Sequence, residues 1–309
     1  MDIKTIGVVG AGTMGNGIAQ VFAQAGLDVQ LVDVARPMLD RARGTIEKSL
    51  GKFVEKGTLT SADRDATLGR LSMKTSLEGL READFVVEAI VENVDAKRAL
   101  FASLDGIVKA ESILASNTSS ISITTIAAAT ARPSRVLGMH FMNPVPLMPL
   151  VELIAGYQTS PDSMRTASEL CVRLGKTPVE AADSPGFIAN RVLMPMINEA
   201  IFAVMEGVGT PDAIDTVMKL DESPDGASRA RRLHRPRRVP GDPQRAARGP
   251  GRSEVPRLSV ATPDGRRGAT RSKVGPGLLR VLTRSPPRAG GGSAFPTTSR
   301  SDSSARSPR

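Results

Sequence analysis

Short apolar runs alternate with helical patterns along the first two thirds of the chain. Residues 5–9 are apolar and rich in β-branched side chains, which predicts a buried strand. A helical pattern then continues to Ala25, Gly26 ends it, and residues 28–33 form a second apolar run. This order predicts a strand–helix–strand unit at the N-terminus.

The same alternation continues to about residue 184. Residues 37–69 have a charged helical pattern that residues 57–60 split in two. Further strands are predicted at residues 71–73, 84–88, 112–116, 135–139, 150–155 and 176–181, with helices at 94–109 and 161–174 between them. Alternating strands and helices predict an α/β fold, a Rossmann-like doubly wound sheet over residues 1–184. Helices at residues 185–208 and 211–220 would begin a truncated, all-helical C-terminal domain over 185–220.

The composition changes near residue 220. Residues 1–220 contain 21 Lys and Arg against 25 Asp and Glu, whereas residues 221–309 contain 20 against 7 and hold 12 of the 22 prolines. The net charge of +9 therefore arises in the last part of the chain. Its charge, proline and glycine content predict a disordered basic tail. Because this tail has few aromatic side chains for base stacking, we expect no nucleic-acid partner.

Cysteine content and hydropathy limit the location of the protein. Cys171 is the single cysteine, so no disulfide framework is possible. No run reaches the roughly 18 apolar residues of a membrane span, and the N-terminus lacks the pattern of a secretion signal. We expect a cytoplasmic protein without a membrane partner or a metal site.

Three glycines follow the first predicted strand. Gly10, Gly12 and Gly15 have the spacing of a dinucleotide-binding turn, in which a pyrophosphate lies at a helix N-terminus. Asp33 ends the second strand, 18 residues after Gly15, where a carboxylate can bind a ribose 2′-hydroxyl. A carboxylate at this position would repel a 2′-phosphate, so the sequence predicts NAD rather than NADP.

Two further segments follow predicted strands and could carry chemistry. Residues 116–120, Ser-Asn-Thr-Ser-Ser, could bind a ligand at the carboxyl end of a strand or could simply cap the next helix. His140 is one of two histidines, and Glu152 lies 12 residues later within an apolar run. A buried carboxylate needs a partner, and pairing with His140 would fix the imidazole tautomer. A structural histidine and a separate carboxylate remain the alternative.

Four runs carry a resemblance to a known family: FVVEAIVENVDAKRALF, ILASNTSSISIT, GMHFMNPVPLMPLVELI and DSPGFIANRVL. Their order and spacing resemble the L-3-hydroxyacyl-CoA dehydrogenases over residues 3–220, and bacterial 3-hydroxybutyryl-CoA dehydrogenases are the most similar members. The resemblance implies an NAD-dependent oxidoreductase that interconverts (S)-3-hydroxyacyl-CoA and 3-oxoacyl-CoA in fatty acid or butanoate metabolism. It also implies a homodimer.

The resemblance also implies residue roles. His140 would take the proton of the substrate 3-hydroxyl and Glu152 would orient it, while Ser119 and Asn190 would contact the substrate oxygens. The helical pair at residues 37–69 would hold the CoA portion, with Ser61 and Lys52 as candidates. The residues expected at the NAD site are Gly10, Gly12, Thr13, Met14, Gly15, Asp33, Glu92, Lys97 and Asn143.

The resemblance ends near Leu220. The family continues with helices that form most of the dimer contact, whereas this chain continues with DESPDGASRARRLHRP. Such a composition is typical of GC-rich coding sequence in a shifted frame, and back-translation from Asp221 permits segments like the missing ones. We therefore predict a reading-frame shift near Leu220, a compromised dimer and little or no turnover; an evolved basic arm is the alternative.

Two functional alternatives stay open. One is an inactive NAD-binding remnant of this enzyme. The other is a β-hydroxyacid dehydrogenase that acts on free acids, which would share the nucleotide-binding domain but gives no reason for the spacing of His140 and Glu152.

Overall fold

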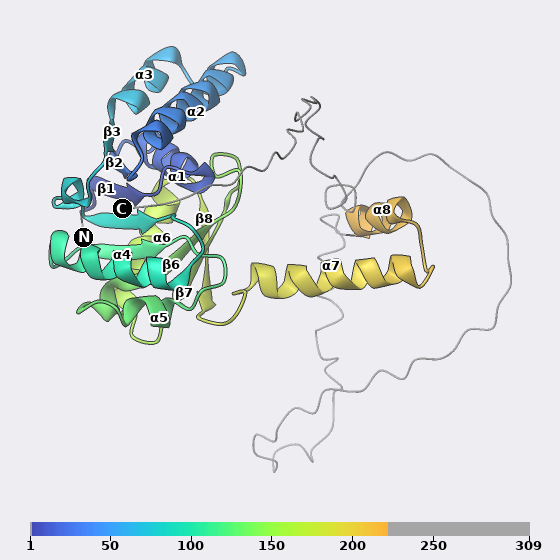
Figure 1. The fold of residues 1–309 in the computed structure, drawn as a ribbon. Coiled ribbons are helices and arrows are strands. Elements are labelled where there is room, and N and C mark those ends of the chain that lie inside the picture. The colour runs from blue at the N-terminus through green and yellow to red at the C-terminus, as the bar shows by residue number, and fades with distance from the viewer. Residues whose placement is uncertain (1, 222–309) are drawn as a thin grey trace, which may run out of the picture. The chain divides into compact units, whose positions relative to one another are not determined.

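The computed structural model describes residues 2–221 (Figure 1). The chain divides into two compact units, Met1–Ile197 and Asn198–Arg309. Within the described residues one sheet has the strand order β3-β2-β1-β4-β5-β6-β7-β8. Its strands are β1 (Thr5–Val9), β2 (Asp28–Val32), β3 (Leu71–Lys74), β4 (Phe85–Glu88), β5 (Ile113–Ser116), β6 (Val136–Phe141), β7 (Leu150–Ala155) and β8 (Thr177–Ala182). The predicted Rossmann-like fold is confirmed.

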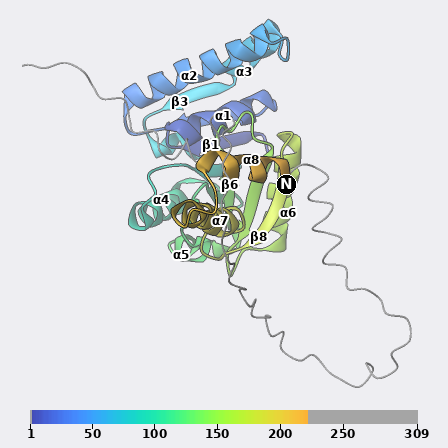
Figure 2. The ribbon, with the colours of Figure 1, turned by 90° about the vertical axis from the view of Figure 1, so that its right-hand side faces the viewer.

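Helices between the strands cover both faces of this sheet, and two more helices follow β8 in the sequence. The helices are α1 (Thr13–Gln24), α2 (Arg36–Glu55), α3 (Ser61–Gly69), α4 (Val94–Ile107), α5 (Ile123–Ala127), α6 (Pro161–Arg173), α7 (Ala189–Met205) and α8 (Pro211–Asp221). Two short 3-10 turns, η1 (Leu77–Leu80) and η2 (Pro133–Arg135), complete the elements. Figure 2 shows α4 and α5 on one side of the sheet and α6 on the other.

The core is divided by the sheet because successive side chains of a strand point to opposite faces. In β4, Phe85 and Val87 join the hydrophobic cluster that includes α1, α2 and α6. Val86 joins the second cluster, which includes α4 and α5. Burial on both faces explains why these strands appear in the sequence as short continuous apolar runs.

The strand directions change after β6. Strands β1 to β6 pair in parallel, β7 runs antiparallel to β6, and β8 is parallel to β7. The antiparallel register places His140 directly opposite Glu152. Lys176 holds the β6–β7 connection by donating to the carbonyls of Val145 and Met148 at 2.6 and 2.7 Å. Burial lowers the pKa of Lys176.

The helix predicted at residues 185–208 is shorter in the structure. It begins at Ala189 because Gly186 and Phe187 both have positive φ, 78° and 49°, which no right-handed helix contains. Apolar side chains of α7, such as Val192 and Met205, are exposed. The predicted domain boundaries stay predictions, and the predicted tail at 221–309 lies almost wholly outside the described residues.

No helix within residues 2–221 is both long enough and apolar enough to span a membrane.

Candidate active site

The glycine turn between β1 and α1 fits a bound pyrophosphate. A Cβ on Gly15 would lie 1.7 Å from the carbonyl oxygen of Gly10, so only glycine permits this close packing of helix and strand. Gly10 itself has φ of 102°. A Cβ on Gly12 would meet nothing within 4 Å. α1 begins after Gly12 without a side-chain cap or an acidic residue in its first turn, which leaves its N-terminus suited to an anion.

Asp33 lies beside this turn at the end of β2. Its two carboxylate oxygens accept hydrogen bonds from the main-chain N–H of Ala11 and Ala35, at 2.8 and 3.0 Å. Asp33 and Gly12 also line a cavity of about 470 Å³ at the carboxyl ends of β1, β2 and β4. Strand order reverses at this point, between β1 and β4, which is where doubly wound sheets bind nucleotides.

A buried lysine joins two of the carboxylates near this site. Lys97 is 1% exposed and donates to Glu88 at 2.5 Å and to Glu92 at 3.3 Å. Glu92 in turn accepts from the hydroxyl of Thr118 at 2.6 Å and from the N–H of Ser119 at 3.0 Å. Burial alone would raise the pKa of Glu92. The bonds from Thr118 and Ser119, with the charge of Lys97, outweigh that effect and lower the pKa below its ordinary value.

His140 and Glu152 form a buried pair. Nδ1 of His140 lies 2.8 Å from Oε2 of Glu152, and the two side chains are 10% and 1% exposed. The other oxygen, Oε1, accepts from the main-chain N–H groups of Ile188 and Ala189, at 3.0 and 2.8 Å. Both carboxylate oxygens are therefore bonded, as a buried carboxylate requires.

Ser119 and Asn190 meet although 71 residues separate them. The Asn190 amide donates to the Ser119 carbonyl at 3.2 Å. Ser119 lies in the turn that follows β5, and its hydroxyl lies 3.3 Å from Glu92. Asn143 follows the His140 strand and lines a second cavity, of about 390 Å³, together with Gly12 and Thr13.

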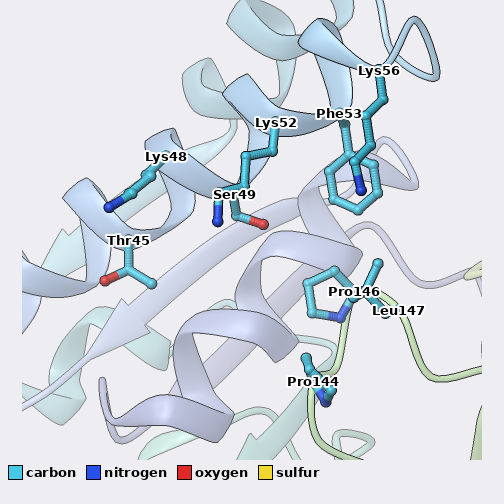
Figure 3. A pocket seen from close by; sticks show the side chains of 9 residues that line it. All are labelled: Thr45, Lys48, Ser49, Lys52, Phe53, Lys56, Pro144, Pro146 and Leu147. Atoms are coloured by element: carbon cyan, nitrogen blue, oxygen red, sulfur yellow. The ribbon is translucent and has the colours of Figure 1, made fainter.

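A lysine-lined cavity lies between α2 and the β6–β7 connection. Its volume is about 340 Å³, and Figure 3 shows α2 side chains above the proline-rich connection. The lining residues are Thr45, Lys48, Ser49, Lys52, Phe53, Lys56, Pro144, Pro146 and Leu147. The predicted residue Lys52 lines this cavity, whereas Ser61 begins α3 and does not.

Several residues of the candidate site were missed in the sequence. Glu88 ends an apolar strand, and a lone carboxylate in that position was a usable signal of a buried partner. Lys48 and Lys56 flank Lys52 at intervals of four, the spacing of one helix face, which could also have been found. Phe187 carried no signal, because its contact with His140 depends on tertiary structure.

Family models and known proteins resemble most of the described chain. The NAD binding domain model of 3-hydroxyacyl-CoA dehydrogenase matches residues 5–184, and the C-terminal domain model matches residues 186–227. A probable 3-hydroxybutyryl-CoA dehydrogenase of Deinococcus radiodurans is 58% identical over 214 residues, which are 69% of this chain and 77% of that protein. A Bacillus subtilis relative of the same name is 51% identical over 220 residues, 71% of this chain and 77% of that protein.

A solved structure shares the fold. The (S)-3-hydroxybutyryl-CoA dehydrogenase of Ralstonia eutropha superposes with a TM-score of 0.69 at 48% identity, covering 71% of this chain and 77% of that one. The fold, the glycine turn and the matching family model together define an NAD-dependent oxidoreductase. The chain belongs to the 3-hydroxyacyl-CoA dehydrogenase family. The predicted family and NAD cofactor are confirmed.

Proposed function

We propose that this chain interconverts (S)-3-hydroxybutyryl-CoA and acetoacetyl-CoA, in fatty acid or butanoate metabolism, with His140 as the catalytic base. One observation carries the proposal: His140 Nδ1 lies 2.8 Å from a buried Glu152 that is held in register opposite it. The names of relatives at up to 58% identity support the choice of a short 3-hydroxyacyl chain.

The pair of side chains can hold and release a proton. An ionised Glu152 accepts the Nδ1 proton of His140, which leaves the Nε2 lone pair as the base for the substrate 3-hydroxyl. The carboxylate also stabilises the imidazolium that forms when the proton arrives. Bound NAD supplies the hydride acceptor. Gly10, Gly12 and Asp33 would hold it, since their turn leaves room for a pyrophosphate and a ribose.

Five further predicted residues have geometry that supports a place in the site. The Asn190 amide donates to the main-chain carbonyl of Ser119, which holds the two residues next to each other. Both can therefore contact the same substrate carbonyl or hydroxyl. Glu92 accepts from the N–H of Ser119 and is itself paired with Lys97, which supports a role for both residues in ordering the site. Asn143 shares a cavity with Gly12, consistent with a place near the cofactor.

The lysine-lined cavity supports a CoA thioester over a free acid. Ammonium groups of Lys48, Lys52 and Lys56 suit phosphates, while Phe53 and Pro146 provide apolar surface. The cavity adjoins the connection that begins directly after the His140 strand. Assembly as a homodimer, a cytoplasmic location, and independence of membranes and nucleic acids stay predictions.

Three measurements separate the candidate functions. We expect slow NADH oxidation with acetoacetyl-CoA and none with free acetoacetate, because the helices beyond Leu220 are predicted to be out of frame. Turnover of free acetoacetate at an equal or higher kcat/KM would instead favour the free-acid dehydrogenase. NADH binding with no turnover of either compound would identify the inactive remnant. Replacing His140 by Asn should remove any turnover while NADH binding persists.

A further inference from the structure

The segment of residues 183–190, between β8 and the first turn of α7, makes contacts throughout the candidate active site. Asp183 accepts three hydrogen bonds from the start of α5. Asn190 donates to the carbonyl of Ser119. Between these two ends, the main chain binds Glu152 and the Phe187 ring packs on His140. This segment is therefore tied to both halves of the catalytic pair.

The backbone at Phe187 is unusual. Its φ of 49° is the only positive value for a non-glycine residue in the described chain, and it follows a φ of 78° at Gly186. A bulky side chain rarely adopts this conformation, and strained residues of this kind cluster at functional sites. The consequence here is geometric, because the next two N–H groups, of Ile188 and Ala189, donate to the same oxygen of Glu152.

The side chain at the same position contacts the other member of the pair. The Phe187 ring is 3% exposed, and its centroid lies 5.9 Å from that of His140 with an interplanar angle of 60°. This is an edge-on arrangement that aromatic rings favour. The hydrogen bond to Glu152 fixes one atom of the imidazole, Nδ1. A ring packed beside the imidazole restricts the remaining rotation about Cβ–Cγ.

We propose that Phe187 is a positioning residue for the reaction. Its ring holds the plane of the His140 imidazole, and its left-handed backbone directs two amide groups at Glu152. One residue thus fixes both members of the pair, His140 through its ring and Glu152 through the backbone that follows it. The proposal rests on the proposed role of His140 as base, yet the contact that carries it can be measured without turnover.

The chain suits a direct spectroscopic test because it has two histidines, His140 and His234. Imidazole nitrogen shifts of the full chain with ¹⁵N-labelled histidine report the tautomer of each ring, and His234→Gln assigns the signals. Nitrogen shifts are preferred over proton shifts, since removing the Phe187 ring also removes its ring current. Phe187→Leu removes the ring, and Phe101→Leu is the control, since Phe101 is fully buried on α4.

We expect two well-separated nitrogen shifts for His140 in the unsubstituted chain and in Phe101→Leu. In Phe187→Leu the two shifts should move toward each other as a second tautomer becomes populated. Any turnover of acetoacetyl-CoA should fall about tenfold or more in kcat, with the Kd for NADH unchanged. If Phe187→Leu does not fold, Phe187→Met, which also lacks the aromatic ring, is used in the same measurements.

Nitrogen shifts and kcat in Phe187→Leu that equal those of Phe101→Leu would overturn the proposal. Averaged shifts in the unsubstituted chain would also overturn it, because the imidazole would then not be held. Failure of the proposed function has a different signature: NADH binds, acetoacetyl-CoA is not reduced, and the nitrogen shifts still respond to Phe187. The two failures are therefore distinguishable.

Discussion

His140 and Glu152 face each other across β6 and β7, and the Glu152 carboxylate binds the imidazole with one oxygen and the start of α7 with the other. The pairing requires that β7 runs antiparallel to β6, whereas all other neighbouring strands of the sheet pair in parallel. Because all these partners are main-chain groups or buried side chains, the imidazole is oriented before any substrate arrives. Preorganisation of this kind lowers the cost of reaching the transition state.

Glu152→Gln should disrupt one of the two interactions of the carboxylate. An amide cannot accept hydrogen bonds with both of its ends, so either His140 or the N–H groups at the start of α7 would face a donor. We expect turnover to fall about 100-fold or more and the free energy of unfolding to fall by about 1–3 kcal/mol. NADH oxidation and urea denaturation measure the two effects. Glu180→Gln, an exposed carboxylate on β8, is the control, and equal behaviour of both variants would contradict the assignment.

Most helices and strands could be predicted from the sequence because buried segments have a recognisable spacing of apolar residues. Residues 5–9 and 150–155 are largely apolar runs that are each followed by a glycine, and both are strands. Strand direction was not predictable in this way. An apolar run is compatible with either direction, so the antiparallel β7 that brings His140 to Glu152 follows only from the assembled sheet.

Residues of the candidate site could be predicted where the residue type itself indicates the chemistry. They were missed where only the three-dimensional arrangement indicates a role. Gly10, Gly12 and Asp33 follow a local spacing that a nucleotide dictates. Phe187 resembles any core phenylalanine in a sequence, and its left-handed backbone depends on contacts made far along the chain. Glu88 is intermediate, since its burial was predictable and its partner Lys97 was not.

Lys97→Met should destabilise the NAD-binding domain. The ammonium group lies between Glu88, which is fully buried, and Glu92, so its removal leaves a buried carboxylate without a counter-charge. We expect the free energy of unfolding to fall by about 3–5 kcal/mol. Glu88→Gln combined with Lys97→Met should recover part of the loss. Chemical denaturation tests this, with Lys4→Met at an exposed ion pair as the control. A loss no larger than that of the control would show that the pair is dispensable.

Asp183→Asn should make stability less sensitive to acid. Burial alone would raise the pKa of Asp183, but hydrogen bonds from Thr124, Ser122 and Ile123 lower it below the ordinary value of 3.8. A lowered pKa means that the ionised form stabilises the fold at pH values above 3.8 and that this contribution is lost as the pH falls through the folded-state value. The variant should lose about 1 kcal/mol at pH 7, as for a lost helix cap, and the difference should disappear in acid.

Urea denaturation of the unsubstituted and Asp183→Asn chains at several pH values measures this difference. Asp40→Asn, at an exposed ion pair on α2, should show little difference at any pH. A difference between the Asp183 variant and the unsubstituted chain that stays constant into acid would contradict the assignment.

Resequencing the gene around the Leu220 codon tests the predicted frame shift. We expect a family-like frame to continue beyond it once the shift is corrected, since similarity to the C-terminal domain model stops at residue 227 and the match covers 77% of the Deinococcus relative. A chain made in the corrected frame should reduce acetoacetyl-CoA far faster than the 309-residue chain. Ordinary enzyme rates from the 309-residue chain itself would refute the prediction of little or no turnover.

Replacing Lys48, Lys52 and Lys56 together by Ala should weaken binding of the CoA portion selectively. The three ammonium groups line one cavity beside Phe53, and each exposed charge contributes modestly, so we expect the KM for acetoacetyl-CoA to rise about tenfold. The KM for acetoacetyl-pantetheine, which lacks the nucleotide, should not change. Added salt should raise the CoA-thioester KM of the unsubstituted chain and have less effect on the variant. Lys4→Ala is the matched control. An equal rise in the KM of both thioesters would show that the nucleotide of CoA binds outside this cavity.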